Sequence, residues 1–276
     1  MARVLGDGGL AGSVLLAAGQ QREVRLRHGL PADGGWLRCA DLIAEPDALA
    51  GWVDRLGTWL RREYGEAPDR TVTGYLLSWY LTVPAQVGAL LFHTARRVPG
   101  LRPVDLAVRF DPDHPRPAEI ALLGDDFACL ADDPDADHPA AMPLPDDAAL
   151  AAVLRGRYAA HAARFLATLD GTLGHRMRFG RHTLWAAATD ALDGAFWRIG
   201  QFCGNEDVGA ANAALVLPTA LAPGALKPFT SPSTLRPAGG RDSADAWTRR
   251  RESCCFHYVL RSGLGPCGTC PRVCER

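Results

Sequence analysis

The chain has 276 residues and a formal net charge of -1 at pH 7, with 47% hydrophobic and 22% charged residues. These values are ordinary for a folded globular protein with one large domain or two small ones, and they exclude the strongly basic field typical of nucleic-acid-binding proteins. No apolar run reaches the roughly 20 residues that cross a bilayer, so we expect neither a nucleic-acid partner nor an integral membrane segment.

The first hundred residues are predicted to be mainly helical. Residues 1–45 are glycine-rich and show little periodicity apart from a short strand at 23–27. From Pro46 onward, apolar residues recur at three- and four-residue spacing, which is typical of an amphipathic helix with proline in its first turn. The stretch 71–98 is more apolar and contains Pro84, which predicts either two helices or one kinked helix.

The pattern changes to that of strands in the middle of the chain. Residues 104–110 alternate between apolar and polar, a turn rich in proline and aspartate follows, and residues 118–123 alternate less cleanly. This pattern predicts a β-hairpin, with a third short strand at 127–130. The loop 131–147 is rich in aspartate, and because its spacing fits no calcium-binding loop we expect a solvated acidic loop.

Helical periodicity returns in the second half of the chain. It runs from Asp146 to Leu169, and again from Thr183 to about Phe202, with a basic loop between the two helices. Residues 218–246 contain five prolines and little periodicity, which indicates an irregular connection.

The predicted architecture is one α+β domain that is predominantly helical, with a small central antiparallel sheet. Residues 1–246 are expected to form the body, with the hairpin near 104–130. Residues 247–276 are expected to form a cysteine-rich segment packed on that body.

Five of the eight cysteines lie in this last segment. Cys254 and Cys255 are adjacent, eleven residues separate them from Cys267-x-x-Cys270, and Cys274 follows. The apolar stretch 9–18 makes a poor secretory signal, so we expect the protein in the cytoplasm, where structural disulfides are rare. The clustering therefore favours metal binding or redox chemistry.

The spacing of the cysteines favours a centre with more than one metal ion. Two residues between Cys267 and Cys270 let both sulfurs reach one metal, and Gly268 lets the backbone approach closely. An adjacent pair such as Cys254-Cys255 is unusual in zinc sites, whereas in a two-metal centre the two thiolates can go to different ions. By chemistry alone, an iron–sulfur cluster ranks first, structural zinc second and a thiol–disulfide pair third. Four thiolates fit a [2Fe–2S] cluster, which passes one electron at a time.

Two neighbouring features have both a functional and a plain structural interpretation. Arg249, Arg250 and Arg251 precede the cysteine pair, where their charge would raise the potential of a cluster and attract an anionic partner. The alternative interpretation, with equal weight, is that the three arginines form a solvated basic run without a functional role. His257 is a candidate donor of a hydrogen bond to the sulfur of a ligand cysteine, or a surface histidine without a role.

The cysteine segment resembles a known signature. Arg250-Arg-Glu-Ser-Cys-Cys-Phe-His-Tyr258, followed by Cys267-Gly-Thr-Cys-Pro271, is similar to the C-terminal motif of the FhuF-like ferric-siderophore reductases. The segment 184–192 also resembles the Leu-Trp helix that precedes this motif in the family. The resemblance implies a [2Fe–2S] cluster and leaves Cys274 without a counterpart. The ligands that it implies are Cys254, Cys255, Cys267 and Cys270.

The resemblance also implies a function. A reductase of this kind would release iron in the cytoplasm, because siderophores bind hard Fe(III) through oxygen far more tightly than Fe(II), so one electron is enough. A hydroxamate siderophore is the expected substrate type. No Gly-x-Gly-x-x-Gly turn is present, so the electron is expected from a separate donor such as a ferredoxin or its reductase. The candidate substrate-binding residues, chosen because positive charge and an aromatic ring precede a helix, are Arg176, Arg178, Arg181 and Trp185.

Two alternatives remain open from the sequence. The first is a binding protein whose C-terminus is a four-cysteine zinc knuckle. The second is an electron carrier that has the [2Fe–2S] cluster but no siderophore site.

Overall fold

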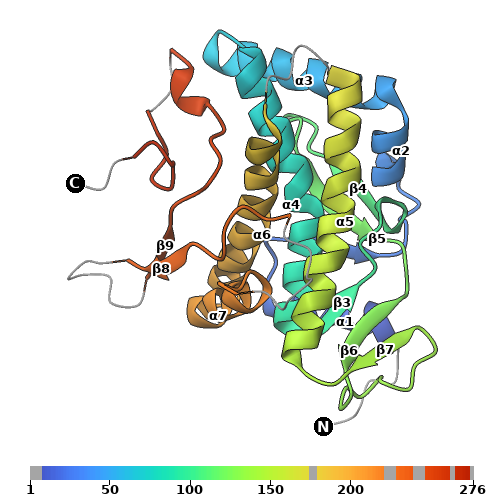
Figure 1. Cartoon of the computed structure of the whole chain (residues 1–276). Coiled ribbons are helices and arrows are strands. Elements are labelled where there is room, and N and C mark those ends of the chain that lie inside the picture. Colours follow the sequence, from blue (N-terminus) through green and yellow to red (C-terminus); the bar gives the residue numbers. More distant parts are fainter. Residues whose placement is uncertain (1–7, 174–178, 221–227, 239–245, 262–264, 274–276) are drawn as a thin grey trace.

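The computed structural model describes residues 8–173, 179–220, 228–238, 246–261 and 265–273. The chain is α+β and predominantly helical, as predicted (Figure 1). Its α-helices are α1 (Gly9–Gln20), α2 (Cys39–Ala44), α3 (Pro46–Tyr64), α4 (Asp69–Ala95), α5 (Asp147–Leu173), α6 (Arg181–Phe202) and α7 (Glu206–Val216). Its strands are β1 (Arg25–His28), β2 (Trp36–Arg38), β3 (Arg97–Pro99), β4 (Leu106–Phe110), β5 (Pro117–Leu122), β6 (Phe127–Leu130), β7 (Ala141–Leu144), β8 (Leu235–Pro237) and β9 (Trp247–Arg249).

Helix α4 forms the centre of the molecule. It packs against α6 along most of its length and also touches α1, α3 and α5. It is one continuous helix that includes the buried Pro84, because neighbouring helices hold it on nearly all sides. Within the described ranges, α4 alone is long and apolar enough to cross a membrane, and 72% of its apolar window is buried inside the fold, as in the core helix of a globular domain.

Three small sheets surround the helices. The predicted hairpin is confirmed as the antiparallel pair β4–β5, which β2 extends on one edge and β1 on the other. The predicted third strand is β6, but it pairs with β3 and β7 in a separate sheet. The β1–β5 and β6–β7 pairs are parallel, so the sheets are mixed where an antiparallel sheet was expected. Strands β8 and β9 form an antiparallel ribbon.

The acidic loop between β6 and β7 has a structural role that its sequence did not reveal. The buried guanidinium of Arg97 donates hydrogen bonds to Asp133 and Asp135, at 2.5 and 2.8 Å. The same guanidinium donates to the carbonyl of Gly9 at 2.7 Å and thereby holds the start of α1. Two of the expected solvated carboxylates are therefore partners in a largely buried ion-pair network.

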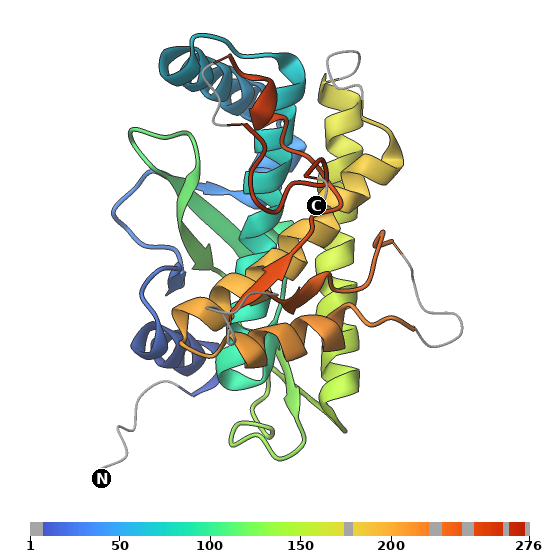
Figure 2. The same cartoon turned by 90° about the vertical axis from the view of Figure 1, so that its left-hand side faces the viewer.

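The chain after β9 lies outside the helical layer. In Figure 1 this segment (red) is on the left of α4 and α6, whereas the strands β4 to β7 are on the right. Figure 2 shows it from the front, crossing α6 and then running along the first turns of α4. The cysteines are thus carried on an irregular segment that depends on two helices for its position.

Candidate metal centre and the hollow beside it

Asp190 on α6 anchors the chain immediately before the cysteine pair. Its carboxylate is buried and accepts hydrogen bonds from the backbone N–H groups of Glu252 and Ser253, at 2.9 and 2.7 Å, and from the Ser253 hydroxyl at 2.5 Å. Burial raises the pKa of Asp190, and the nearby positive charge of Arg249 and these hydrogen bonds partly offset that rise. The buried Asp190 side chain therefore holds residues 252 and 253, which immediately precede Cys254, against α6.

Arg249 fixes the end of β9 to the same face of α6. Its guanidinium donates to the backbone carbonyl of Asp190 at 2.8 Å and lies 3.5 Å from the Asp193 carboxylate. Gly194, one turn after Asp190, provides the space, since a Cβ there would lie only 2.7 Å from the guanidinium. Asp193 in turn accepts hydrogen bonds from Ser233 and Thr234. In this anchor both carboxylates, those of Asp190 and Asp193, come from α6, and the guanidinium of Arg249 comes from β9.

Gly74 on α4 lets the cysteine pair approach the helix backbone. A Cβ built on Gly74 would lie 2.9 Å from the carbonyl oxygen of Cys255 and 3.1 Å from its Cα. Thr71, one turn earlier, donates its hydroxyl to the carbonyl of Phe256 at 3.3 Å. The segment thus lies directly on the backbone of α4, which only a residue without a side chain permits.

The chain bends immediately after the cysteine pair. Phe256 adopts the left-handed region (φ 59°), which is uncommon for a non-glycine residue. Its ring stacks on Phe179 with centroids 5.5 Å apart, and the guanidinium of Arg70 lies over it at 5.1 Å. The backbone N–H of Phe256 points back to the sulfur of Cys254 at 3.3 Å. This bend is what allows two adjacent cysteines to serve one centre.

The four predicted ligands come together as two pairs of sulfurs. The sulfurs of Cys254 and Cys270 are 4.0 Å apart, too far for a disulfide bond. Nη2 of Arg251 lies 3.6 Å from the sulfur of Cys255 and 3.2 Å from that of Cys267, so these two sulfurs are neighbours as well. Every cysteine in the described ranges is a free thiol.

Arg251 is the principal charged neighbour of the sulfurs. Burial disfavours its charge, but the hydrogen bond to Cys255 and the attraction of the Cys255 and Cys267 sulfurs outweigh that effect and raise its pKa. Its backbone N–H also donates to the carbonyl of Thr269 at 2.9 Å, which ties the Cys267–Cys270 turn to the cysteine pair. Burial raises the pKa of the Cys254 thiol, whereas the Phe256 N–H lowers it.

His257 lies beside the sulfurs but has another partner. Its Nδ1 is 2.7 Å from the hydroxyl of Tyr75, and its ring meets Tyr64 edge-on at 5.1 Å between centroids. Burial raises the pKa of Tyr75, with Tyr64 and the cysteine sulfurs adding to the rise. Among the described residues, Arg251 and the Phe256 amide donate to cysteine sulfur, and His257 does not.

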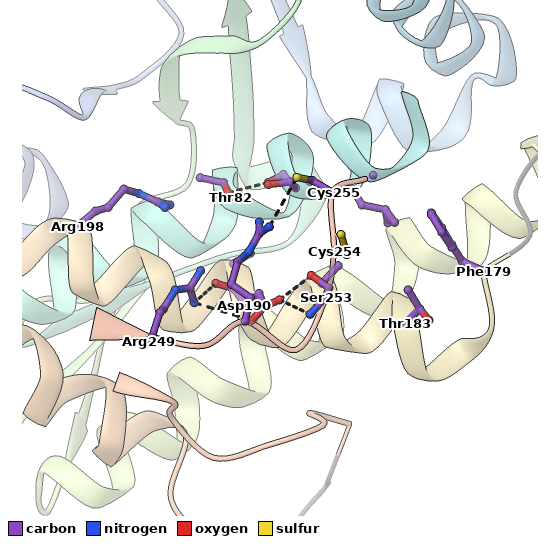
Figure 3. A pocket seen from close by; sticks show the side chains of 15 residues that line it. Thr82, Phe179, Thr183, Asp190, Arg198, Arg249, Ser253, Cys254 and Cys255 are labelled. Atoms are coloured by element: carbon purple, nitrogen blue, oxygen red, sulfur yellow. Dashed lines mark hydrogen bonds and ion pairs between the residues drawn. The ribbon is translucent and has the colours of Figure 1, made fainter. Parts of the chain in front are cut away.

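A hollow opens between α4, α6 and the cysteine pair (Figure 3). Its cavity volume is about 80 Å³, and it is partly open to solvent. We call it the arginine hollow because three guanidinium groups line it. Its polar lining comprises Ser78 and Thr82 from α4, Thr183, Asp190 and Arg198 from α6, and Arg249, Arg251, Ser253, Cys254 and Cys255 from the C-terminal segment.

The two predicted substrate residues that the structure describes, Arg181 and Trp185, do not line this hollow. Arg176 and Arg178 fall outside the described residues, as does Cys274. Arg181 is exposed at the first position of α6. Trp185 is half-buried, and its ring packs edge-on against Phe229 with centroids 6.1 Å apart. The structure therefore does not bring Arg181 and Trp185 to the cysteine pair.

The comparisons with known proteins leave the family open. No model of a known protein family matches the chain, and a search of curated proteins finds no match. The interpretation of this centre therefore rests on its own residues.

The arrangement of the thiols is compatible with more than one class of metal centre. A mononuclear zinc site needs four ligands around a single point. A [2Fe–2S] cluster needs two protein ligands on each iron, which the two pairs of sulfurs would supply. Over the ranges that the structure describes, no three histidine, cysteine or carboxylate side chains are placed to hold one ion, and this bears equally on both classes.

Sequence reasoning missed the residues that position this centre. Asp190 and Arg198 interrupt an otherwise apolar face of α6, and charged residues in such a face are rarely buried without a specific partner or ligand. That was the available signal. The role of Gly74 had no local signal, because its contact is to a residue far along the chain.

Proposed function

We propose that the protein is a cytoplasmic one-electron reductase of ferric siderophores, with a [2Fe–2S] cluster held by Cys254, Cys255, Cys267 and Cys270. The observation that carries this proposal is the placement of four free thiols in two pairs of neighbouring sulfurs, with Cys254 and Cys255 lining the arginine hollow. When bound, such a cluster accepts and passes on single electrons.

The residues around the thiols are suited to that role. Arg251 places positive charge at 3.2 to 3.6 Å from two sulfurs, and the Phe256 amide donates to a third. Hydrogen bonds and positive charge at cysteine sulfur stabilise the more negative, reduced state of a cluster and so raise its potential. Asp190, Gly74 and the bend at Phe256 hold the ligands in place, which limits rearrangement when the charge changes.

The hollow favours a reductase over a simple electron carrier. A carrier needs only an exposed edge near its cluster, whereas this centre borders a recess of about 80 Å³ lined by three arginine side chains. Reduction needs one electron from an external donor such as a ferredoxin or its reductase, which converts chelated Fe(III) to Fe(II). The weakened chelate then releases the metal, and the freed oxygen ligands take up protons from water.

Release of iron from a chelate tests this function directly. Protein reduced under anaerobic conditions and mixed with a ferric siderophore should yield about one Fe(II) per reduced chain, because a [2Fe–2S] cluster carries one electron. Fe(II) is measured with a ferrous-specific chromogenic chelator, and Cys255→Ser serves as the inactive control. A reduced protein that passes its electron to a ferredoxin-type acceptor but to no ferric chelate would show a carrier instead.

A further inference from the structure

Arg198 is the one arginine of the hollow whose charge has no partner among the described residues. It lies on α6, two turns after Asp190, and is half-buried at the wall of the arginine hollow. In Figure 3 it stands apart from the dashed network that joins Arg249, Asp190 and Ser253. Burial and the neighbouring charge of Arg249 lower the pKa of Arg198 to about 10. An arginine in this position is costly unless something neutralises it.

The other charges of the hollow are already matched. Arg249 lies 4.0 Å from the Asp190 carboxylate and 3.5 Å from that of Asp193. Arg251 turns toward the sulfurs of Cys255 and Cys267. What remains is a single positive charge facing a recess that adjoins the cysteine pair, with the hydroxyl side chains of Ser78 and Thr82 on the opposite, α4 wall.

We infer that the arginine hollow is a binding site for an anionic group of the substrate, and that Arg198 pairs with a carboxylate there. A guanidinium fork matches the two oxygens of a carboxylate, and the Ser78 hydroxyl is suited to donate a hydrogen bond to the same group, whereas the Thr82 hydroxyl already donates to the carbonyl of Ser78 at 2.7 Å. This inference rests on the proposed reductase function for the identity of the substrate. It departs from the hydroxamate type expected from the sequence, because neutral tris-hydroxamate chelates carry no such group.

The substrate class that follows is a ferric chelate with carboxylate arms, of which ferric citrate is the simplest probe. A carboxylate held by Arg198 would bring the bound iron toward the cysteine pair, since both line the same recess. Pairing with the carboxylate neutralises the partly buried charge of Arg198, and this neutralisation adds to the affinity for the anion.

Thermal unfolding of the full-length protein with metal-free citrate tests the site without any redox step. We expect the Tm of the wild type to rise with citrate, in proportion to the logarithm of its concentration once that exceeds Kd, because an anion that binds only the folded state stabilises it by mass action. Arg198→Gln should lose this rise and should have a higher Tm than the wild type without citrate, since an unmatched charge has gone. Arg61→Gln, an exposed arginine on α3 outside the hollow, is the control and should respond as the wild type does.

Steady-state reduction of two chelates tests the substrate class. For ferric citrate, Arg198→Gln should raise KM by about 10- to 100-fold, the usual loss for one charged hydrogen-bonded pair. Its KM for a neutral ferric tris-hydroxamate should not change, and Arg198→Lys should restore part of the citrate affinity.

Three results would overturn the inference. The first is an equal citrate response in wild type and Arg198→Gln, which would indicate non-specific stabilisation. The second is a Tm of Arg198→Gln below that of the wild type, which would indicate a structural role. The third is an unchanged KM for ferric citrate. If the protein bound citrate through Arg198 but reduced no ferric chelate, the anion site would stand and the proposed reductase function would be refuted.

Discussion

Replacing Asp190 with alanine is expected to lower the free energy of unfolding by about 3–5 kcal/mol, because the buried carboxylate accepts several hydrogen bonds that the variant cannot replace. These are the three hydrogen bonds that hold residues 252 and 253. Asp190 is 6% exposed, so water would not fully take its place, and Arg249 would keep the Asp193 carboxylate as its charged partner. The cysteine pair would then be released from α6, and bound iron should be lost. Denaturant unfolding and the ratio of iron to protein measure the two effects.

Asp54→Ala is the control for this substitution. Asp54 is an exposed aspartate on α3, and its removal should change stability by less than about 0.5 kcal/mol. An Asp190→Ala protein with wild-type stability and full iron content would show that the segment is positioned by other contacts.

The substitution Gly74→Ala should empty the centre while leaving the helix intact. The added methyl group would lie 2.9 to 3.1 Å from three backbone atoms of Cys255, and backbone cannot rotate away as a side chain could. Alanine is also a better helix former than glycine, so α4 itself gains stability. We therefore expect an unchanged far-UV circular dichroism spectrum with most of the bound iron lost, measured as iron per chain and as visible absorption.

A second glycine provides the matched control. Gly51 lies in α3, where an added Cβ meets nothing within 4 Å. Gly51→Ala should retain all its iron and gain about 0.5–1 kcal/mol of stability from helix propensity alone. If Gly74→Ala retained its iron as well, the close approach of the cysteine segment to α4 would not be needed for metal binding.

Local pattern predicted the elements whose signal is local. Helix α3 has a proline at its start and a regular apolar face, and β4 and β5 alternate around a proline-rich turn. Helix α1 (Gly9–Gln20) was not predicted, because its glycines, alanines and leucines define no polar face and its start is held by Arg97, 88 residues away. Helix α7 was missed for the related reason that small residues dominate it.

The residues of the candidate site likewise fall into those that local sequence could predict and those that it could not. The four cysteines could be named from spacing because chelation depends on neighbouring residues. Asp190, Gly74 and Arg198 could not, because their roles arise only when α4 and α6 lie side by side and the C-terminal segment crosses both. The sequence signal for this arrangement is that Asp190 and Arg198 are charged residues within the otherwise apolar helix α6.

Visible and EPR spectra of anaerobically purified protein, before and after dithionite, test the cluster most directly. Cys255→Ser and Cys203→Ser are measured alongside, since Cys203 is a free thiol outside the C-terminal segment. We expect a red-brown protein that bleaches and gains an EPR signal on reduction, retained in Cys203→Ser and lost in Cys255→Ser. A colourless protein that carries stoichiometric zinc when produced with iron available would contradict the cluster, and with it the reductase.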